Sequence, residues 1–202
     1  MFNRKNPLPK GSKKLIGAWT LYDWANSVYS LVISTAIFPI YYSEYIFANS
    51  DSVILFNMDL NKDTVISLVS ATSFLIVAFL SPFLSGIADY LGNKKTFMKF
   101  FVFLGSFSCI GLYWFELETI QFGLILYILA LIGLWGSLVF YNSYLPDITF
   151  PSQTNTVSAK GFTMGYIGSV ILLIINLIMI IYYEQLNLSS EVLSQSRLYH
   201  QS

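Results

Sequence analysis

Polar residues repeat along the first long apolar stretch of this 202-residue chain, and their types suit the binding of a small solute or a proton. They recur at three- and four-residue steps, which places them on one stripe of a helix: Thr20, Asp23, Asn26, Ser27, Ser30 and Ser34. Tyr29 flanks this stripe. Because isolated polar groups are costly in lipid, the stripe predicts a helix that lines a solute pathway, with Asp23 as a protonatable group. Pairing of Asp23 with nearby lysines at the membrane surface is the alternative.

A second polar set lies in the fourth apolar stretch. Gly133, Gly136 and Ser137 form a small-residue face there, with Tyr141 and Asn142 close by. Tight helix packing explains the glycines well but explains Tyr141 and Asn142 less well. We therefore expect Tyr141 and Asn142 to contact a solute, and hydrogen bonding between helices stays open as their other role.

A short charged segment separates the second and third apolar stretches. It runs from Ser85 to Lys95 and contains Gly86, Asp89, Gly92 and Lys94. A carboxylate, glycines and paired lysines between two membrane spans suggest a hinge at one membrane face, and we expect Asp89 to lie in the turn itself. The simpler alternative is that the lysines only fix the orientation of the protein.

Catalytic and metal-binding patterns are weak. Cys109 is the only cysteine and His200 the only histidine, so a zinc site or a hydrolase triad is not expected. The pair Tyr22-Asp23 matches one motif of intramembrane aspartyl proteases, but the partner motif is absent because Asp89 has no glycine directly before it. The sequence predicts no enzyme, no cofactor and no metal, with the protease as a remote alternative.

The composition indicates the element that must carry these residues, which is the membrane-spanning helix. Hydrophobic residues make up 55% of the chain and charged residues 11%, against roughly 25% charged in ordinary soluble domains. A spanning helix needs about 20 apolar residues. Five stretches satisfy this requirement: Trp19 to Tyr42, Thr64 to Ala88, Phe97 to Phe115, Phe122 to Tyr144 and Phe162 to Tyr183. We predict an all-α membrane protein with about five transmembrane helices.

Positive charge is distributed unevenly along the chain. With a cytoplasmic N-terminus, only Lys62 and Arg197 fall outside, and the other nine basic residues fall inside: Arg4, Lys5, Lys10, Lys13, Lys14, Lys94, Lys95, Lys99 and Lys160. This asymmetry obeys the positive-inside rule and predicts a cytoplasmic N-terminus, with the plasma or inner membrane as the default location. Since the formal net charge is zero, no nucleic-acid partner is expected.

The chain divides into three segments: a basic cytoplasmic N-terminus at residues 1–18, a five-span helical bundle at 19–183 and a polar tail at 184–202. We expect residues 43–63 to form an exposed loop and residues 145–161 a longer inner loop. In the fifth span, Gly161 and Gly165 have the spacing that brings two helices close together.

The charged segment resembles the signature loop of the major facilitator superfamily, whose pattern is roughly Gly-x-Leu-Ala-Asp-x-x-Gly-Arg-Lys. The matching residues are Ile87, Ala88, Asp89, Gly92 and Lys94. Ser85 replaces the first glycine and Asn93 the first basic residue. Two further stretches, Tyr22 to Ser27 and Phe140 to Asp147, are similar to the Atg22-like branch, which includes vacuolar amino-acid effluxers and bacterial permeases.

The resemblance covers roughly residues 15–183, most of the amino-terminal half of a twelve-span transporter. It implies alternating access around a central site that moves a small solute, such as an amino acid, across the bilayer. The positions it assigns to that site are Asp23, Asn26, Tyr29, Tyr141 and Asn142. It assigns a gating role to the loop of Gly86, Asp89, Gly92, Lys94 and Lys95.

Five spans require a second half, supplied by a homodimer or another polypeptide, and otherwise the chain is a fragment. A non-transporting membrane protein that keeps these helices for assembly or regulation is the alternative function.

Overall fold

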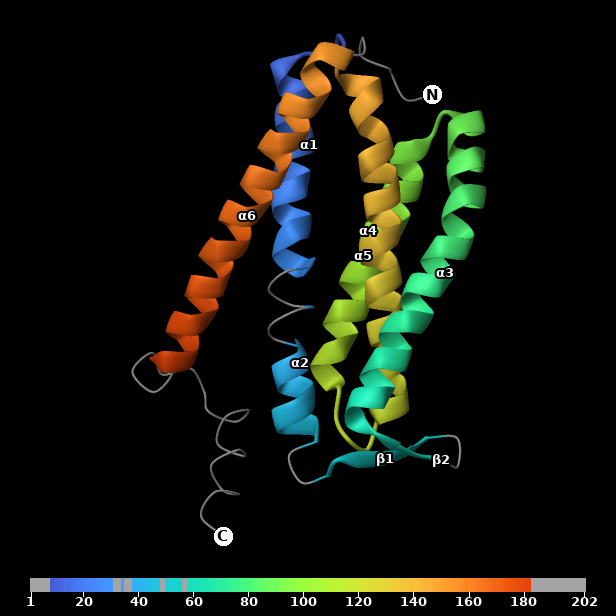
Figure 1. Ribbon diagram of the computed structural model, residues 1–202, viewed down its shortest axis with the longest axis vertical. Coiled ribbons are helices and arrows are strands. Elements are labelled where there is room, and N and C mark those ends of the chain that lie inside the picture. Colours follow the sequence, from blue (N-terminus) through green and yellow to red (C-terminus); the bar gives the residue numbers. More distant parts are fainter. Residues whose placement is uncertain (1–7, 31–33, 35–37, 48–49, 56–57, 183–202) are drawn as a thin grey trace.

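The computed structural model describes residues 8–30, 34, 38–47, 50–55, 58–182, and Figure 1 shows them as a bundle of long helices with a small β-hairpin at one end. The helices are α1 (Lys13–Val28), α2 (Phe38–Ile40), α3 (Lys62–Leu91), α4 (Lys94–Gly111), α5 (Ile120–Ile148) and α6 (Pro151–Ile181). Two shorter helical turns follow α2 and α4, namely η2 (Tyr41–Ile46) and η3 (Leu112–Trp114). The hairpin strands are β1 (Ser52–Leu55) and β2 (Met58–Asn61).

Four of the described helical segments are long and apolar enough to cross a membrane: Lys62–Leu91, Lys94–Trp114, Ile120–Ile148 and Pro151–Met179. They match the second to fifth predicted spans, and the all-α fold class is confirmed. The first predicted span contains α1 and α2, while its residues 31–33 and 35–37 lie outside the described part, as do Tyr183 and the predicted tail 184–202. Helix α1 begins six residues before the predicted Trp19, because the Ser12 side chain caps it by accepting a hydrogen bond from the Leu15 N–H at 3.3 Å.

The segment between α3 and α4 is shorter than expected. Helix α3 continues through Asp89 to Leu91, so the prediction that Asp89 belongs to a turn is wrong. Gly92 ends the helix with a left-handed φ of 60°, and the Asn93 N–H donates to the Ala88 carbonyl at 3.1 Å. The helix can reach this point because nothing between Ser85 and Leu91 forbids helical backbone. Only Gly92 and Asn93 separate the two helices.

The predicted inner loop at residues 145–161 is also wrong, because nearly all of it is helical. Helix α5 runs to Ile148 with Pro146 inside its last turn, and α6 starts at Pro151. Proline is tolerated in the first turn of a helix, where its missing N–H would have no helical partner. The Phe150 N–H donates to the Gln153 side chain at 3.5 Å, which caps α6. The polar composition of this segment reflects exposed helical positions, not a loop.

The expected exposed loop at 43–63 contains the hairpin instead. Strands β1 and β2 pair antiparallel, and Leu55 of β1 is buried. The hairpin is joined to the start of α3 because Lys62 donates its backbone N–H to the Asp51 carbonyl and forms an ion pair with the Asp51 side chain at 3.1 Å. The sequence analysis predicted a loop here because the segment is rich in acidic residues. The short alternation of apolar residues that forms the strands was therefore missed.

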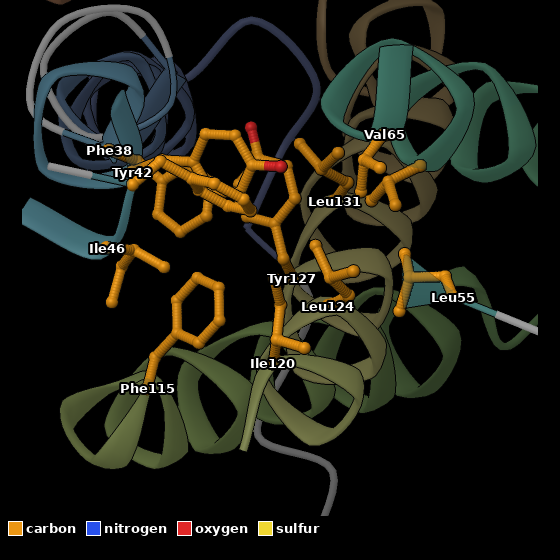
Figure 2. Close-up of a cluster of buried hydrophobic side chains, with 12 residues drawn as sticks. Phe38, Tyr42, Ile46, Leu55, Val65, Phe115, Ile120, Leu124, Tyr127 and Leu131 are labelled. Carbon is orange, nitrogen blue, oxygen red and sulfur yellow. The ribbon is translucent and has the colours of Figure 1, made fainter. Parts of the chain in front are cut away.

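The hairpin covers a core of buried apolar side chains, of which Figure 2 shows the centre. Phe38 stacks on Tyr127 of α5 with ring centroids 3.9 Å apart, and the Phe115 ring is nearly parallel to Phe38 at 6.0 Å. The Tyr41 hydroxyl donates to the Phe115 carbonyl at 2.8 Å. This core joins α2 and η2 to α5 at what we call the hairpin end of the bundle (Figure 1).

Two sets of helices pack differently within the bundle. Helix α5 packs along α3 and α4, and we call these three the α3–α4–α5 group. Helix α1 packs mainly along α6 and only lightly against α5, and we call α1 and α6 the α1–α6 pair (Figure 1). Their shared end, opposite the hairpin, is called the basic end because Lys94, Lys95 and Lys99 lie there.

Candidate functional site

A cluster of charges joins three helix ends at the basic end. The Lys94 ammonium donates to Asp147 Oδ2 at 2.8 Å and lies 3.0 Å from Asp89 Oδ1. It also donates to the Ser143 carbonyl at 3.3 Å. Asp89 comes from the last turn of α3, Lys94 from the start of α4 and Asp147 from the end of α5. We call these three side chains the Lys94 cluster.

The burial of the Lys94 cluster suits contacts that break and re-form. The Lys94 side chain is 18% exposed, whereas Asp89 and Asp147 are 60% and 51% exposed. Charge-assisted hydrogen bonds of this kind are strong when dry, but water competes with them at half-exposed carboxylates. The cluster can therefore hold the three helix ends together without locking them permanently.

Two of the other predicted gating residues, Gly86 and Lys95, take no part in this contact. Lys95 is exposed, and Gly86 has no neighbouring atom within 4 Å of the position that a Cβ would occupy. Gly92 provides the left-handed turn that places Lys94 beside Asp89. Gly92, Asp89 and Lys94 thus form one structural unit, with Gly86 and Lys95 outside it.

Asp147 is a site residue that the sequence interpretation missed. The signal was present in the charge distribution, because eight of the eleven acidic residues fall on the predicted outer side. The other three are Asp23, Asp89 and Asp147, which share the side that collects the lysines. An acidic residue on the side where lysines concentrate is a candidate ion-pair partner. A search for such residues would have identified Asp147.

Asp23 lies deep in the contact between α1 and α6. Its side chain is buried, and one carboxylate oxygen faces the Cα of Gly161, where an added Cβ would come within 2.9 Å. Four residues further along each helix, Ser27 of α1 packs on Gly165, and Trp24 packs on Gly168 in the same interface. The predicted role of Gly161 and Gly165 in bringing helices together agrees with this packing.

Three stacked aromatic rings join the α1–α6 pair to α5 beside Asp23. Trp19 stacks on Tyr141 with centroids 4.3 Å apart, and Tyr22 stacks on the same ring at 5.0 Å. The Trp19 Nε1–H donates to the Tyr141 backbone carbonyl at 3.1 Å. The Tyr141 hydroxyl lies next to the Asp23 carboxylate.

A groove of about 470 Å³ separates α1 from α4 and α5. Asn26 and Tyr29 line it from α1 and the turn that follows, and Cys109 of α4 lies beside Tyr29. Ser137 and Gly133 line it from α5. The groove therefore offers an amide, hydroxyl groups and apolar walls, which suits a small solute with both polar and apolar parts.

The five predicted solute-binding residues do not form one set. Asn26 and Tyr29 line the groove, whereas Asp23 and Tyr141 lie together at the junction of α1, α5 and α6. Asn142 is exposed and does not line the groove. The polar stripe of α1 thus divides between the groove and the contact with α6.

A second groove of about 410 Å³ lies between the hairpin, α3 and α5. Its walls are apolar apart from Thr72 and Gln121. Within the described residues no three His, Cys, Asp or Glu side chains come together to hold a metal ion. The polar groups able to act on a solute therefore concentrate in the first groove and in the adjoining Asp23 junction.

Comparison with known proteins gives a consistent result. A family model described as "Vacuole effluxer Atg22 like" matches residues 11–153. The chain is 38% identical over 181 residues to a Bacillus subtilis (strain 168) protein named "Uncharacterized MFS-type transporter YxiO", covering 90% of this chain and 41% of that one. It is 28% identical over 159 residues to an "Uncharacterized protein" of Aquifex aeolicus (strain VF5), covering 78% and 36%. The chain thus spans about two fifths of the length of these relatives. No solved structure matches.

Proposed function

This chain belongs to the Atg22-like family of major facilitator superfamily transporters, and we propose that it forms the amino-terminal half of a transporter that moves a small solute by alternating access. It is a multi-pass membrane protein of a transporter family, not an enzyme, so the intramembrane protease hypothesis is dropped. Membership of this transporter family implies that the protein interacts with a solute and with the lipid bilayer.

The Lys94 cluster is the observation that carries the proposal. Lys94 holds the ends of α3, α4 and α5 together through two carboxylates that water can reach. In an alternating-access cycle, such a contact stabilises one conformer and breaks in the other. The cluster then controls the rate of interconversion and does not contact the solute, so Asp89, Lys94 and Asp147 are gating residues.

The solute site of this half is proposed at the groove and its junction with Asp23. Asn26 and Tyr29 would contact the solute directly, while Asp23 and Tyr141 would act from behind the groove. The exposed Asn142 would meet the second half. We propose amino acids as the solutes to test first, on the basis of the effluxer family and of the mixed polar and apolar groove walls.

The proposed transporter needs a second half, from a further copy of this chain, another polypeptide or a continuation of the same one. We propose a cytoplasmic N-terminus, with residues 1–18 inside and the hairpin outside, because basic residues concentrate at the opposite end from the hairpin. The bacterial relative supports the cell membrane as the location.

Counterflow of labelled amino acids in proteoliposomes tests the proposal. The chain is reconstituted alone, and also after co-expression with the part of the Bacillus subtilis relative that it does not match. Uptake only with the second half present would support a half-transporter. No uptake of any solute in either preparation, with both polypeptides correctly inserted, would favour the assembly or regulatory alternative.

Two neighbouring lysines provide a matched control for the gating role. Lys94→Met removes the partner of two carboxylates, whereas Lys95→Met removes an exposed lysine that forms no ion pair among the described residues. We expect Lys94→Met to lower turnover with little change in solute affinity, and Lys95→Met to leave both near wild type. Asp89→Asn should act like Lys94→Met, and a pure loss of affinity would contradict gating.

A further inference from the structure

The groove beneath the hairpin has no role in the transport proposed above. It lies between the hairpin, α3 and α5 and measures about 410 Å³, within the roughly 300–1,000 Å³ of sites that hold a small molecule. Its back wall belongs to the buried core, because Leu55, Val65 and Leu124 come together there from the three elements (Figure 2). Other lining residues are apolar and about half exposed, namely Met58, Leu68 and Ile125. The groove is therefore open to the surroundings of the chain.

Almost no polar group is available inside this groove. The Thr72 hydroxyl donates to the Leu68 carbonyl at 2.7 Å within α3, so it needs no ligand. Gln121, the other polar lining residue, is exposed in the first turn of α5 at the hairpin end. A polar solute would lose its hydrogen bonds to water here and gain few in return. The groove therefore suits an apolar chain whose polar group stays at the mouth, by which we mean the hairpin end of the groove.

The groove lies at the depth of one membrane leaflet. Tyr113 and Trp114 are exposed in η3 at the hairpin end, and exposed aromatic residues of this kind mark the membrane–water interface. From Val65 to Thr72 the groove follows α3 for about 10 Å, which is close to the ~15 Å hydrocarbon thickness of one leaflet. A lipid acyl chain that enters from the interface therefore matches the groove in depth.

The groove closes near the middle of α3, which excludes a spanning helix from it. Beyond Thr72, Ile76 and Val77 of α3 pack with the cluster that contains Ile132 of α5. Further toward the basic end, α3, α4 and α5 leave a cavity of only about 10 Å³, about the least that can hold one water molecule. A spanning helix is about 10 Å wide and needs a seat along the roughly 30 Å of the hydrocarbon core. The groove instead suits a chain that ends within one leaflet.

The mouth of the groove is acidic. Three exposed carboxylates lie within three residues of groove-lining positions: Asp59, Asp63 and Glu118. Lys62, the basic residue beside them, is already paired with Asp51 at 3.1 Å. Charges within a Debye length of about 8 Å still interact at physiological salt. The mouth therefore attracts a headgroup that ends in an ammonium group and repels an anionic one.

We propose that this groove binds one acyl chain of a phospholipid with an ammonium headgroup, of the phosphatidylethanolamine class. The acyl chain fills the apolar walls, and the ammonium group faces the carboxylates at the mouth. The Gln121 amide can donate to the phosphate or ester oxygens. Because the lipid binds only the folded contact of the hairpin with α3 and α5, it stabilises that contact. The proposal does not depend on transport, so it can be tested on the chain alone.

The experiment uses the full 202-residue chain in nanodiscs that contain phosphatidylethanolamine and phosphatidylglycerol in equal amounts. A trace of either lipid carries a photoreactive diazirine in its acyl chain, and mass spectrometry identifies the labelled residues. We expect the phosphatidylethanolamine probe to label Leu68 about fivefold more than the phosphatidylglycerol probe, the selectivity of one charge near a membrane surface. Both probes should label the exposed residues Ile171 and Ile174 of α6 equally. Equal labelling of Leu68 by the two probes would overturn the proposal.

Two tryptophan variants test whether the lipid occupies the groove itself. Ile125→Trp fills the groove and should reduce labelling of Leu68 to the level seen on α6. Leu75→Trp is the matched control, because Leu75 is exposed on α3 outside the groove, and it should leave the labelling unchanged. Undiminished labelling in Ile125→Trp would contradict the site.

A second variant keeps the proposal testable if Ile125→Trp fails to fold. Asp63→Asn combined with Glu118→Gln leaves the apolar walls intact and neutralises two exposed side chains at the mouth. We expect the two probes to label Leu68 nearly equally in this variant. A preference for phosphatidylethanolamine that survives the double substitution would contradict the role of the acidic mouth.

A segment of the second half of the transporter is the alternative occupant of the groove. Benzoylphenylalanine in place of Leu68 distinguishes the two when the chain is co-expressed with the unmatched part of the Bacillus subtilis relative. A photoadduct with phospholipid would support the lipid site. A cross-link to the second polypeptide in place of the lipid adduct would overturn it.

Discussion

The α3–α4–α5 group and the α1–α6 pair both use glycines for close helix contact, but they bring different atoms together. Between α4 and α5, Gly133 lies on the backbone of Gly105 and Phe101. Between α1 and α6, Gly161 and Gly165 receive the side chains of Trp19, Asp23 and Ser27. The closest α4–α5 contact is backbone on backbone, although the Phe101 ring also packs on Gly136. The α1–α6 contact seats only polar and aromatic side chains against a helix.

This difference predicts which set of helices is rigid. Backbone atoms in direct contact have no side-chain rotamers with which to adjust, and the Lys94 cluster ties the same group at the basic end. Side chains seated on glycines can change rotamer, hydrogen bonding or protonation while the helices stay paired. We therefore expect the α3–α4–α5 group to move as one body and the α1–α6 pair to adjust against it.

Gly133→Ala should have the largest effect, because the new Cβ would come within 2.5 Å of the Gly105 Cα and 2.7 Å of the Phe101 carbonyl oxygen. Backbone cannot yield as a side chain can, so we expect a loss of about 3 kcal/mol in unfolding free energy, the upper end for overpacking. Thermal unfolding in detergent measures it. Gly105→Ala is the control, since its Cβ would meet the Gly133 Cα at an ordinary 3.5 Å. Equal losses in the two variants would contradict the backbone contact.

Gly161→Ala should cost less, about 1–2 kcal/mol, because the groups in its way are the Trp19 ring at 2.6 Å and an Asp23 oxygen at 2.9 Å. Both belong to side chains that can shift. Gly17→Ala on α1 is the matched control, because no atom lies within 4 Å of its Cβ position. A loss in Gly161→Ala as large as that in Gly133→Ala would contradict the idea that side chains at this contact can shift.

Lys94→Met should lower stability by about 1 kcal/mol, since both carboxylates are half exposed and exposed ion pairs contribute little. The substitution should change the separation of the basic ends of α3 and α5 more clearly than it changes the free energy of unfolding. Disulfide cross-linking between cysteines placed at the basic ends of α3 and α5, in a Cys109→Ser background, measures the separation of those ends. We expect faster and less selective cross-linking in Lys94→Met than in Lys95→Met. Identical patterns would show that the cluster does not hold the group together.

The chemistry of the sites was partly predictable from the sequence. Asp89 and Lys94 could be paired because they sit five residues apart beside a glycine that ends a helix. Asp147 is 53 residues from Lys94, and only the fold brings it to the same ammonium. Likewise, helical spacing placed Asp23 and Asn26 on one stripe, but it could not say that α6 would cover Asp23 while a groove opened beside Asn26.

The spans were predictable from hydropathy, and the connections between them were not. Apolar length alone identifies the helices that correspond to α3, α4, α5 and α6. The segment after Leu145 was misread as a loop because proline and hydroxyl residues are common in loops, although both also suit a helix start. The hairpin was missed because its four-residue strands are stable only when Leu55 packs on the bundle, and that packing is a long-range property.

Gly86→Ala should have the smallest effect on the chain, and of the opposite sign. Gly86 lies inside α3 with no neighbour within 4 Å of its Cβ position, so alanine should stabilise the helix by about 0.5–1 kcal/mol. The thermal unfolding midpoint of the isolated chain should rise accordingly. In a transporter assembled with a second half, the same alanine should reduce counterflow if that half packs closely on this face of the rigid group. A stabilised chain with unimpaired counterflow would instead place Gly86 toward lipid, and the gating role would then belong to the Lys94 cluster without it.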